Sequence, residues 1–190
     1  MRKLTFGMNL SVDGYIAASG DDLGWSVPSD ELFQWWSDRV GATGLALYGR
    51  KLWETMSSHW PTADQKPGAT PAQIEFARRW RDMPKVVFSS TISAVDWNAR
   101  LVTGDAVTEI TRLKTEDAGP MDVGGATLAA AAMRAGLIDE YAIVTHPVGP
   151  PLEQLVARHA PAEVVAGRGD IAVQAQVHAI GQFPHGVSLP

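Results

Sequence analysis

The spacing of hydrophobic and polar positions changes repeatedly along the chain, and each change predicts a new element. Leu4 to Leu10 has the pattern of a first strand, and Asp13-Gly14 marks a turn behind it. After Pro28-Ser29-Asp30-Glu31, apolar residues recur at helical spacing: Leu32, Trp35, Trp36 and Val40. Because Ser29 is a preferred N-cap residue and acids favour the first turn, a helix is predicted to begin here.

The middle of the chain alternates short apolar runs with helical patterns. Leu45 to Tyr48 predicts a buried strand that ends at Gly49-Arg50, and the apolar residues behind it predict a helix. Pro61 to Gly68 is polar and proline-rich, which predicts a loop. Thr70-Pro71 has a cap followed by proline at the first helical position, so another helix begins there and is expected to stop before Pro84.

Strand and helix patterns continue to alternate in the second half. Lys85 to Ser89 and Leu101-Val102 predict strands, and a helix follows Asp105. Met121 to Val123 runs into Gly124-Gly125 and an alanine-rich helix, before a last strand at Tyr141 to Thr145. This order indicates an α/β domain with a largely parallel central sheet.

The last residues follow another pattern. Gly149-Pro150-Pro151 interrupts the alternation, Leu152 to His159 is a weak helical segment, and Ile171 to Ile180 alternates like an edge strand. We therefore predict a domain over residues 1–148 and a divergent segment over residues 149–190, a candidate to complete the edge of the sheet.

Composition limits the chemistry. With 190 residues, 45% of them hydrophobic, and a net charge of −5, the chain has no basic field for nucleic acid or an anionic membrane. The absence of cysteine excludes disulfides, thiolate zinc sites and cysteine nucleophiles. No histidine has the spacing of a metal ligand, so no metal is expected. Neither a signal-type region nor a long apolar span is found, and a cytoplasmic protein is expected.

Three strand ends carry residues suited to an anion. Gly49-Arg50 opens a helix after one strand, Ser89-Ser90 closes a second, and Gly124-Gly125-Ala126-Thr127 closes a third. Ligands of open α/β sheets gather outside the carboxyl ends of strands, so the three could converge. Amides around Gly124 would hold a pyrophosphate, whereas Arg50 and the serines would hold a separate phosphate.

A separate phosphate favours NADPH over NADH as the cofactor. Each feature also has a plain alternative, in which Arg50 is a solvated residue at a helix start and the glycines and serines only form turns. The joint placement supports the cofactor interpretation. Both the G-x-G-x-x-G fingerprint of a standard Rossmann domain and a usable P-loop are absent.

Two acids are candidates for the substrate side. Asp30 lies at the start of a helix near Trp25, where a carboxylate could pair with the amidine-like edge of a pterin or aminopyrimidine. Asp13 lies in Ser11-Val12-Asp13-Gly14. The alternatives are that Asp30 complements the helix dipole and that Asp13 is a turn residue.

Five segments in order resemble the dihydrofolate reductase superfamily. They are Ser11-Val12-Asp13-Gly14-Tyr15-Ile16-Ala17, Gly49-Arg50-Lys51-Leu52-Trp53-Glu54, Lys85-Val86-Val87-Phe88-Ser89-Ser90-Thr91, Val123-Gly124-Gly125-Ala126-Thr127, and Asp139-Glu140-Tyr141 followed by Thr145-His146-Pro147. The closer likeness is to the C-terminal reductase domain of the bifunctional riboflavin-pathway deaminase-reductase. It covers roughly residues 2 to 148.

The resemblance implies a three-layer sandwich with a mostly parallel mixed sheet and flanking helices. It also implies an NADPH-dependent reductase acting on a C=N bond or a sugar carbonyl of a pterin or an aminopyrimidine ribosyl phosphate. The implied cofactor residues are Gly49, Arg50, Ser89, Ser90, Gly124, Gly125, Ala126 and Thr127. Asp30, in a W-x-x-P-x-D run with Trp25 and Pro28, and Asp13 are the implied catalytic residues.

The chain departs from the family in two ways. Without cysteine it cannot contain the zinc-dependent deaminase half. After Pro147 it also lacks the family's glycine-rich turn and Pro-Leu-Phe segment, for which a shifted reading frame and a divergent end are both hypotheses. A lost final hairpin would expose an edge of the sheet, so a homodimer is a further hypothesis. The alternative function is a non-catalytic nucleotide-binding module that keeps the fold.

Overall fold

The computed structural model describes residues 1–18, 23, 24, 26 and 29–146. Its elements in chain order are β1 (Leu4–Ser11), α1 (Asp30–Ala42), β2 (Leu45–Gly49), α2 (Arg50–His59), the 3₁₀ helix η2 (Trp60–Gln65), α3 (Pro71–Asp82), β3 (Lys85–Phe88), β4 (Ala99–Val102), α4 (Ala106–Lys114), β5 (Met121–Gly124), α5 (Ala126–Arg134) and β6 (Glu140–His146). The predicted segments Leu152 to His159 and Ile171 to Ile180 lie outside the described residues.

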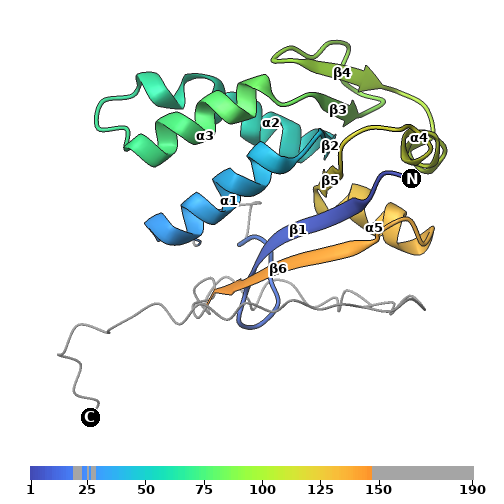
Figure 1. The fold of residues 1–190 in the computed structure, drawn as a ribbon, viewed down its shortest axis with the longest axis horizontal. Coiled ribbons are helices and arrows are strands. Elements are labelled where there is room, and N and C mark those ends of the chain that lie inside the picture. Colours follow the sequence, from blue (N-terminus) through green and yellow to red (C-terminus); the bar gives the residue numbers. More distant parts are fainter. Residues whose placement is uncertain (19–22, 25, 27–28, 147–190) are drawn as a thin grey trace.

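Six strands form one sheet in the order β4-β3-β2-β5-β1-β6, and every pairing between them is parallel. The sheet is strongly twisted, so the arrows of β4 and β6 point in different directions in Figure 1. The prediction of an α/β fold with a mostly parallel central sheet and flanking helices is confirmed. Parallel neighbours also place the carboxyl ends of adjacent strands next to each other, as the site prediction requires.

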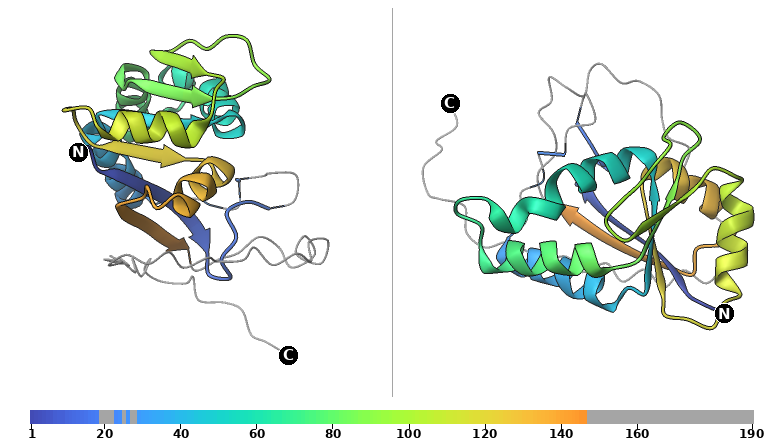
Figure 2. Two further views of the ribbon diagram at one scale, coloured as in Figure 1. Left: turned by 90° about the vertical axis from the view of Figure 1, so that its right-hand side faces the viewer. Right: turned by 90° about the horizontal axis from the view of Figure 1, so that it is seen from above.

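Helices cover both faces of the sheet, which gives three layers (Figure 2). Alternate residues of β2 show why: Leu45 and Leu47 join a core with α4 and α5, whereas Ala46 and Tyr48 join a core with α2 and α3. The strands are apolar on both faces because both faces are covered. This arrangement determines on which face of the sheet the helix after each strand lies.

Three helices begin as the sequence predicts. Ser29 caps α1 by accepting a hydrogen bond from the Leu32 amide, and Thr70 forms a capping box with Gln73 at the start of α3. Asp105 caps α4 in the same manner. Side-chain oxygens thus satisfy amides that have no partner inside the helix. These helix starts are settled by local chemistry.

Two details differ from the prediction. The segment predicted as a loop from Pro61 begins with the 3₁₀ helix η2, whose second residue is Pro61; proline is compatible with the first turn of a helix, so it does not prevent one. The strand β4 begins at Ala99 rather than near Leu101 because Trp97 and Asn98, at φ 52° and 56°, form a tight left-handed turn just before it.

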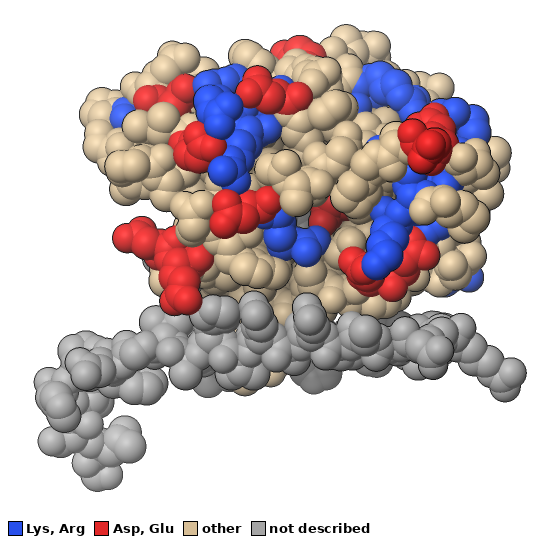
Figure 3. All heavy atoms as spheres, in the orientation of Figure 1, with Lys and Arg blue, Asp and Glu red and all other residues tan. Residues whose placement is uncertain are grey.

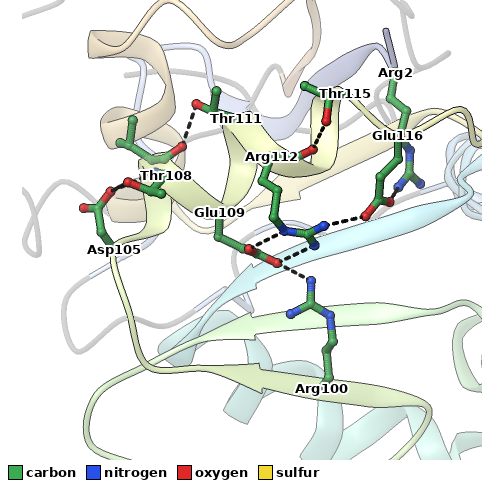
Figure 4. Close-up of polar contacts among 10 residues, drawn as sticks. Arg2, Arg100, Asp105, Thr108, Glu109, Thr111, Arg112, Thr115 and Glu116 are labelled. Carbon is green, nitrogen blue, oxygen red and sulfur yellow. Dashed lines mark hydrogen bonds and ion pairs between the residues drawn. The ribbon is translucent and has the colours of Figure 1, made fainter.

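Charged side chains on the surface are mixed in sign. On the face drawn in Figure 3, lysines and arginines lie beside acids rather than in one basic patch. Figure 4 shows one such chain of ion pairs along α4. It runs from Arg100 through Glu109, Arg112 and Glu116 to Arg2. The solvent-exposed pairs in it contribute little each, but the chain connects β4, α4 and the buried Arg2 before β1.

None of the described helices is both long and apolar enough to span a membrane.

Candidate active site

The candidate site lies where β2 and β5 end side by side. Tyr48 pairs with Gly124, so the two strands end at the same level. From there α2 enters the core on the side of α3, whereas α5 enters the opposite core with Leu128 and Ala129. Adjacent strands whose helices depart to opposite faces leave a crevice between them, the usual ligand position in an open α/β sheet.

Both helices at this crevice begin with a glycine and lack a side-chain cap. Gly49 precedes α2 and Gly125 precedes α5, and neither helix has a capping hydrogen bond or an acid in its first turn. The other three α-helices of the described chain are all capped by a hydroxyl or a carboxylate. First-turn amides and the positive ends of two helix dipoles are therefore available to an anion.

The two turns lie in van der Waals contact, and two of their glycines have a structural reason. A Cβ added to Gly125 would lie 3.6 Å from the Gly49 nitrogen, and one added to Gly49 would lie 3.6 Å from the Leu128 Cβ. Gly125 also has φ +94°, a conformation that other residues rarely adopt. A Cβ on Gly124 would lie 2.3 Å from the Leu52 side chain. The two adjacent glycine turns therefore present backbone amides without side chains, which fits a pyrophosphate.

The predicted Arg50 is the first residue of α2, and its guanidinium contacts Glu54 one turn later. Nη1 donates to both carboxylate oxygens of Glu54 at 2.9 and 2.8 Å. These contacts use Nη1, and the Arg50 side chain is 40% exposed, so Nη2 and Nε are candidates to bind a phosphate. Sequence reasoning missed Glu54, although its i, i+4 spacing from Arg50 is a recognisable signal.

Ser89 and Ser90 follow β3, the neighbour of β2 on the other side. The Ser89 hydroxyl accepts hydrogen bonds from the amides of Thr91 and Ile92, so it stabilises its own turn as the plain alternative expected. It also shares a hydrogen bond of 3.2 Å with the Thr91 hydroxyl, so it would have to exchange this partner to donate to a ligand. Ser90 is exposed. Ala126 and Thr127 are also exposed, at the first two positions of α5.

The two candidate acids lie at the ends of β1 and α1. Asp13 accepts a hydrogen bond from the Ser11 hydroxyl, which in turn accepts from the Tyr15 amide, so Asp13 stabilises the turn after β1. Asp30 is exposed in the first turn of α1. Trp25 and Pro28, the other residues of the W-x-x-P-x-D run, lie outside the described residues.

His146 is a buried residue at the end of β6 that metal-spacing arguments passed over. It pairs with Ser11 in the sheet, and its Nε2 lies 3.4 Å from the Ser26 hydroxyl. Burial lowers the pKa of its imidazole. The sequence signals for this histidine were its place at the end of a strand and its presence in the family-like segment Thr145-His146-Pro147. Within the described ranges, no group of three or more acids and histidines could hold a metal ion.

Comparison with known proteins agrees with this geometry. The family model described as "RibD C-terminal domain" matches residues 2–149. The chain belongs to this family. Its fold is therefore that of the reductase domain of the riboflavin pathway, as the sequence resemblance implied.

Two relatives illustrate the family. The uncharacterized protein YyaP of Bacillus subtilis (strain 168) is 24% identical over 148 residues, which cover 77% of this chain and 76% of YyaP. A crystal structure described as "Putative riboflavin biosynthesis protein" from Shewanella sp. PV-4 superposes with a TM-score of 0.58 at 22% identity, covering 78% of each chain. This second likeness concerns the fold alone.

Proposed function

We propose that the protein is an NADPH-dependent reductase of a small heterocyclic substrate. The observation that carries the proposal is the pair of uncapped, glycine-started helices at the β2–β5 crevice, with Arg50 at the start of one of them. Membership in a family of riboflavin-pathway reductase domains supports it. The candidate substrates are 5-amino-6-(5-phosphoribosylamino)uracil and dihydrofolate.

The cofactor would be held by its charged groups. Amides at the starts of α2 and α5 would bind the pyrophosphate, where two helix dipoles favour negative charge. The free edge of Arg50, with the hydroxyls of Ser89 and Ser90, would bind the 2′-phosphate of NADPH. Glu54 would keep Arg50 in place during this contact. NADH lacks that phosphate and should bind less tightly.

Reduction needs an electron-poor carbon, a hydride and a proton. NADPH supplies the hydride, which would reach the carbon of a C=N bond or of the sugar carbonyl, while a proton goes to the nitrogen or oxygen. Asp30 would accept hydrogen bonds from the amidine-like edge of the substrate and favour protonation of the C=N nitrogen. Asp13 would contribute from the turn after β1, where Ser11 orients it.

Titration calorimetry tests the cofactor assignment. A micromolar NADPH complex corresponds to about −8 kcal/mol, which is readily measured. Arg50→Ala should weaken NADPH by about tenfold or more and NADH far less. Arg78→Ala is a matched control, since Arg78 is also paired with an acid on its own helix, but on α3. Equal losses for both cofactors would remove the 2′-phosphate role, and no binding of either would overturn the proposal.

A second candidate is a nucleotide-binding module without substrate chemistry. The exposure of Asp30 and the occupation of Asp13 by its own turn favour it. Such a module would bind NADPH in the titration but would show no oxidation of NADPH with either substrate. Absorbance of the reduced nicotinamide in single-turnover assays separates the two candidates.

A further inference from the structure

The helix α1 is attached to the sheet by directional polar contacts. The Trp36 indole donates a hydrogen bond of 3.1 Å to the Asn9 side chain on β1. Gly7, two residues earlier on the same face of β1, leaves room for this ring, because a Cβ there would lie 3.1 Å from Trp36. Figure 1 shows α1 running alongside β1. The contact therefore fixes one point of the helix against one strand.

A second contact fixes α1 against a different strand. Arg39 donates from Nη2 to the Asp122 carboxylate on β5 at 2.7 Å. Asp122 also accepts a hydrogen bond from the Gly7 amide. Burial raises the pKa of Asp122, whereas the nearby Arg39 lowers it. The side chains of Arg39 and Asp122 are 26% and 25% exposed, so the pair is partly buried and the carboxylate depends in part on its arginine partner.

The position of Arg39 is specified from several sides. Thr5 of β1 lies between Asp122 of β5 and Glu140 of β6 in the sheet register, so the two acids flank it in one row. The charge of Arg39 acts on both acids. Its guanidinium also lies 5.2 Å from the centre of the Trp35 ring. These contacts define one place for the guanidinium along the strands.

The helix α1 and the strand β5, which Arg39 and Asp122 connect, also carry the two halves of the proposed site. Asp30 is nine residues before Arg39, about 13 Å along the helix. Gly124 follows Asp122 by two residues on β5, about 7 Å away. Trp36 of α1 contacts Asn9 of β1, and Arg39, later on α1, lies at the level of Thr5, which is earlier on β1. The helix α1 therefore runs antiparallel to β1 and brings Asp30 toward the carboxyl ends of the strands.

We propose that Arg39 and Asp122 are positioning residues that set the register of α1 on the sheet, and thereby the position of Asp30 relative to the Gly124-Gly125 turn. Apolar side chains tolerate sliding because their attraction has no direction. A slide of one helical turn, about 5.4 Å, would separate Arg39 from Asp122 and leave a partly buried carboxylate without its arginine. The importance of the Asp30 position rests on the proposed function, whereas the fixed register of α1 on the sheet, here called the register lock, does not.

Distance measurements between spin labels test the lock. The chain has no cysteine, so two introduced cysteines are labelled uniquely. Gln34→Cys on α1 and Thr111→Cys on α4 report the position of α1. Ser58→Cys on α2 with Thr111→Cys is the control pair, which avoids α1. Both pairs are measured in the otherwise native chain, in Asp122→Asn, and in Arg39→Met/Asp122→Leu, where apolar side chains replace the ion pair.

The Gln34 pair should give a narrow distribution in the native chain and one about twofold broader, or shifted, in both altered proteins. The control pair should stay unchanged, and the apolar replacement should keep its melting temperature, as buried ion pairs replaced by apolar residues often do. A folded replacement with an unchanged Gln34 distribution overturns the proposal. If that replacement does not fold, the isosteric Asp122→Asn decides in the same way.

Calorimetry with NADPH on the same variants separates this proposal from the proposed function. The residues of the cofactor cradle do not contact Arg39, so the dissociation constant should stay within about twofold. If the native chain binds no NADPH, the proposed function fails while the spin-label distances still decide the register lock.

Discussion

Gly49 and Gly125 meet across the ends of two adjacent parallel strands, close enough that a Cβ on Gly125 would lie 3.6 Å from the Gly49 nitrogen. Each glycine opens a helix that departs to a different face of the sheet. The contact thus joins two helix starts into one cradle of amides. Its proposed ligand is the cofactor pyrophosphate, and the glycines are the residues that keep the cradle open.

Gly125→Ala should weaken NADPH binding by at least tenfold and lower the free energy of unfolding by about 1–2 kcal/mol, because φ +94° becomes strained in the turn that positions the first amides of α5. Gly136→Ala is the matched control. Gly136 also has a positive φ, at the other end of α5, but has open space around it. The Gly136→Ala protein should lose a similar amount of stability and keep its affinity for NADPH. Equal affinity losses in calorimetry would contradict the cradle.

Asp30→Asn should lower turnover by about a hundredfold or more with whichever proposed substrate is reduced, and leave NADPH affinity unchanged, because it removes the charge that orients the substrate. Asp13→Asn keeps an oxygen that can accept the Ser11 hydrogen bond, so it removes charge without removing the turn. A fall in turnover for Asp13→Asn would assign Asp13 a catalytic role. Normal turnover in both variants would show that neither acid takes part.

Lys85 is a buried cation at the start of β3. Its ammonium donates to the carbonyls of Met83 and Trp97 and lies 4.2 Å from the centre of the Trp80 ring. Burial lowers its pKa from 10.5 to about 8. Between these two values the unfolded chain holds the proton more tightly than the fold does. The cost of burying the charge is therefore fully present below pH 8 and disappears as the pH rises toward 10.5.

The free energy of unfolding should consequently rise between pH about 8 and about 10, by up to about 3 kcal/mol from Lys85 alone. Urea unfolding followed by tryptophan fluorescence measures this slope. Lys85→Met should remove the slope, whereas Lys66→Met, at an exposed lysine, should keep it. Burial raises the pKa of Tyr48, so its titration lowers the free energy of unfolding as the pH rises, but only above its ordinary pKa of 10.0. A slope that persists in Lys85→Met would refute the assignment.

Asp139→Asn should lower the free energy of unfolding by about 1–2 kcal/mol, because it removes the carboxylate from the buried ammonium of Lys114, which keeps the Leu137 carbonyl as a partner. The same carboxylate accepts the Leu4 amide at 2.7 Å, so it joins the segment before β6 to β1. Asp117→Asn, at an exposed acid, should change stability by less than about 0.5 kcal/mol. Chemical unfolding of the three proteins provides the comparison, and similar stabilities would be the contrary result.

Local chemistry explains which parts of the fold were predictable. Caps such as Ser29, Thr70 and Asp105 act on amides two or three residues away, so the sequence contains all of their partners. The left-handed pair Trp97-Asn98 was not predictable in this way. Its conformation is stabilised from a distance, since Lys85 donates to the Trp97 carbonyl and Asn98 donates to the Asp82 carbonyl.

The same distinction applies to the candidate site. Glycines at strand ends predicted where α2 and α5 begin, because a turn and a helix start are local, while their role in binding a cofactor stays a prediction. The pairing of Arg39 with Asp122 spans 83 residues and could not be predicted before the strand order was known. A single acid within the apolar run of β5 was the only signal, and it does not identify its partner. The candidate acids of the substrate side have the same difficulty, since Asp30 and Asp13 come from separate elements and their relative position depends on the fold.

The position of β1 has a consequence for how the chain folds during synthesis. Its two neighbours in the sheet are β5 and β6, so the first strand to leave the ribosome has no partner until residue 121 and beyond have been made. Pairing over such sequence separations is slow, and an unpaired strand edge promotes aggregation. We expect ribosome-bound chains that stop before Met121 to remain protease-sensitive around β1, and protection to arise only when β5 has emerged.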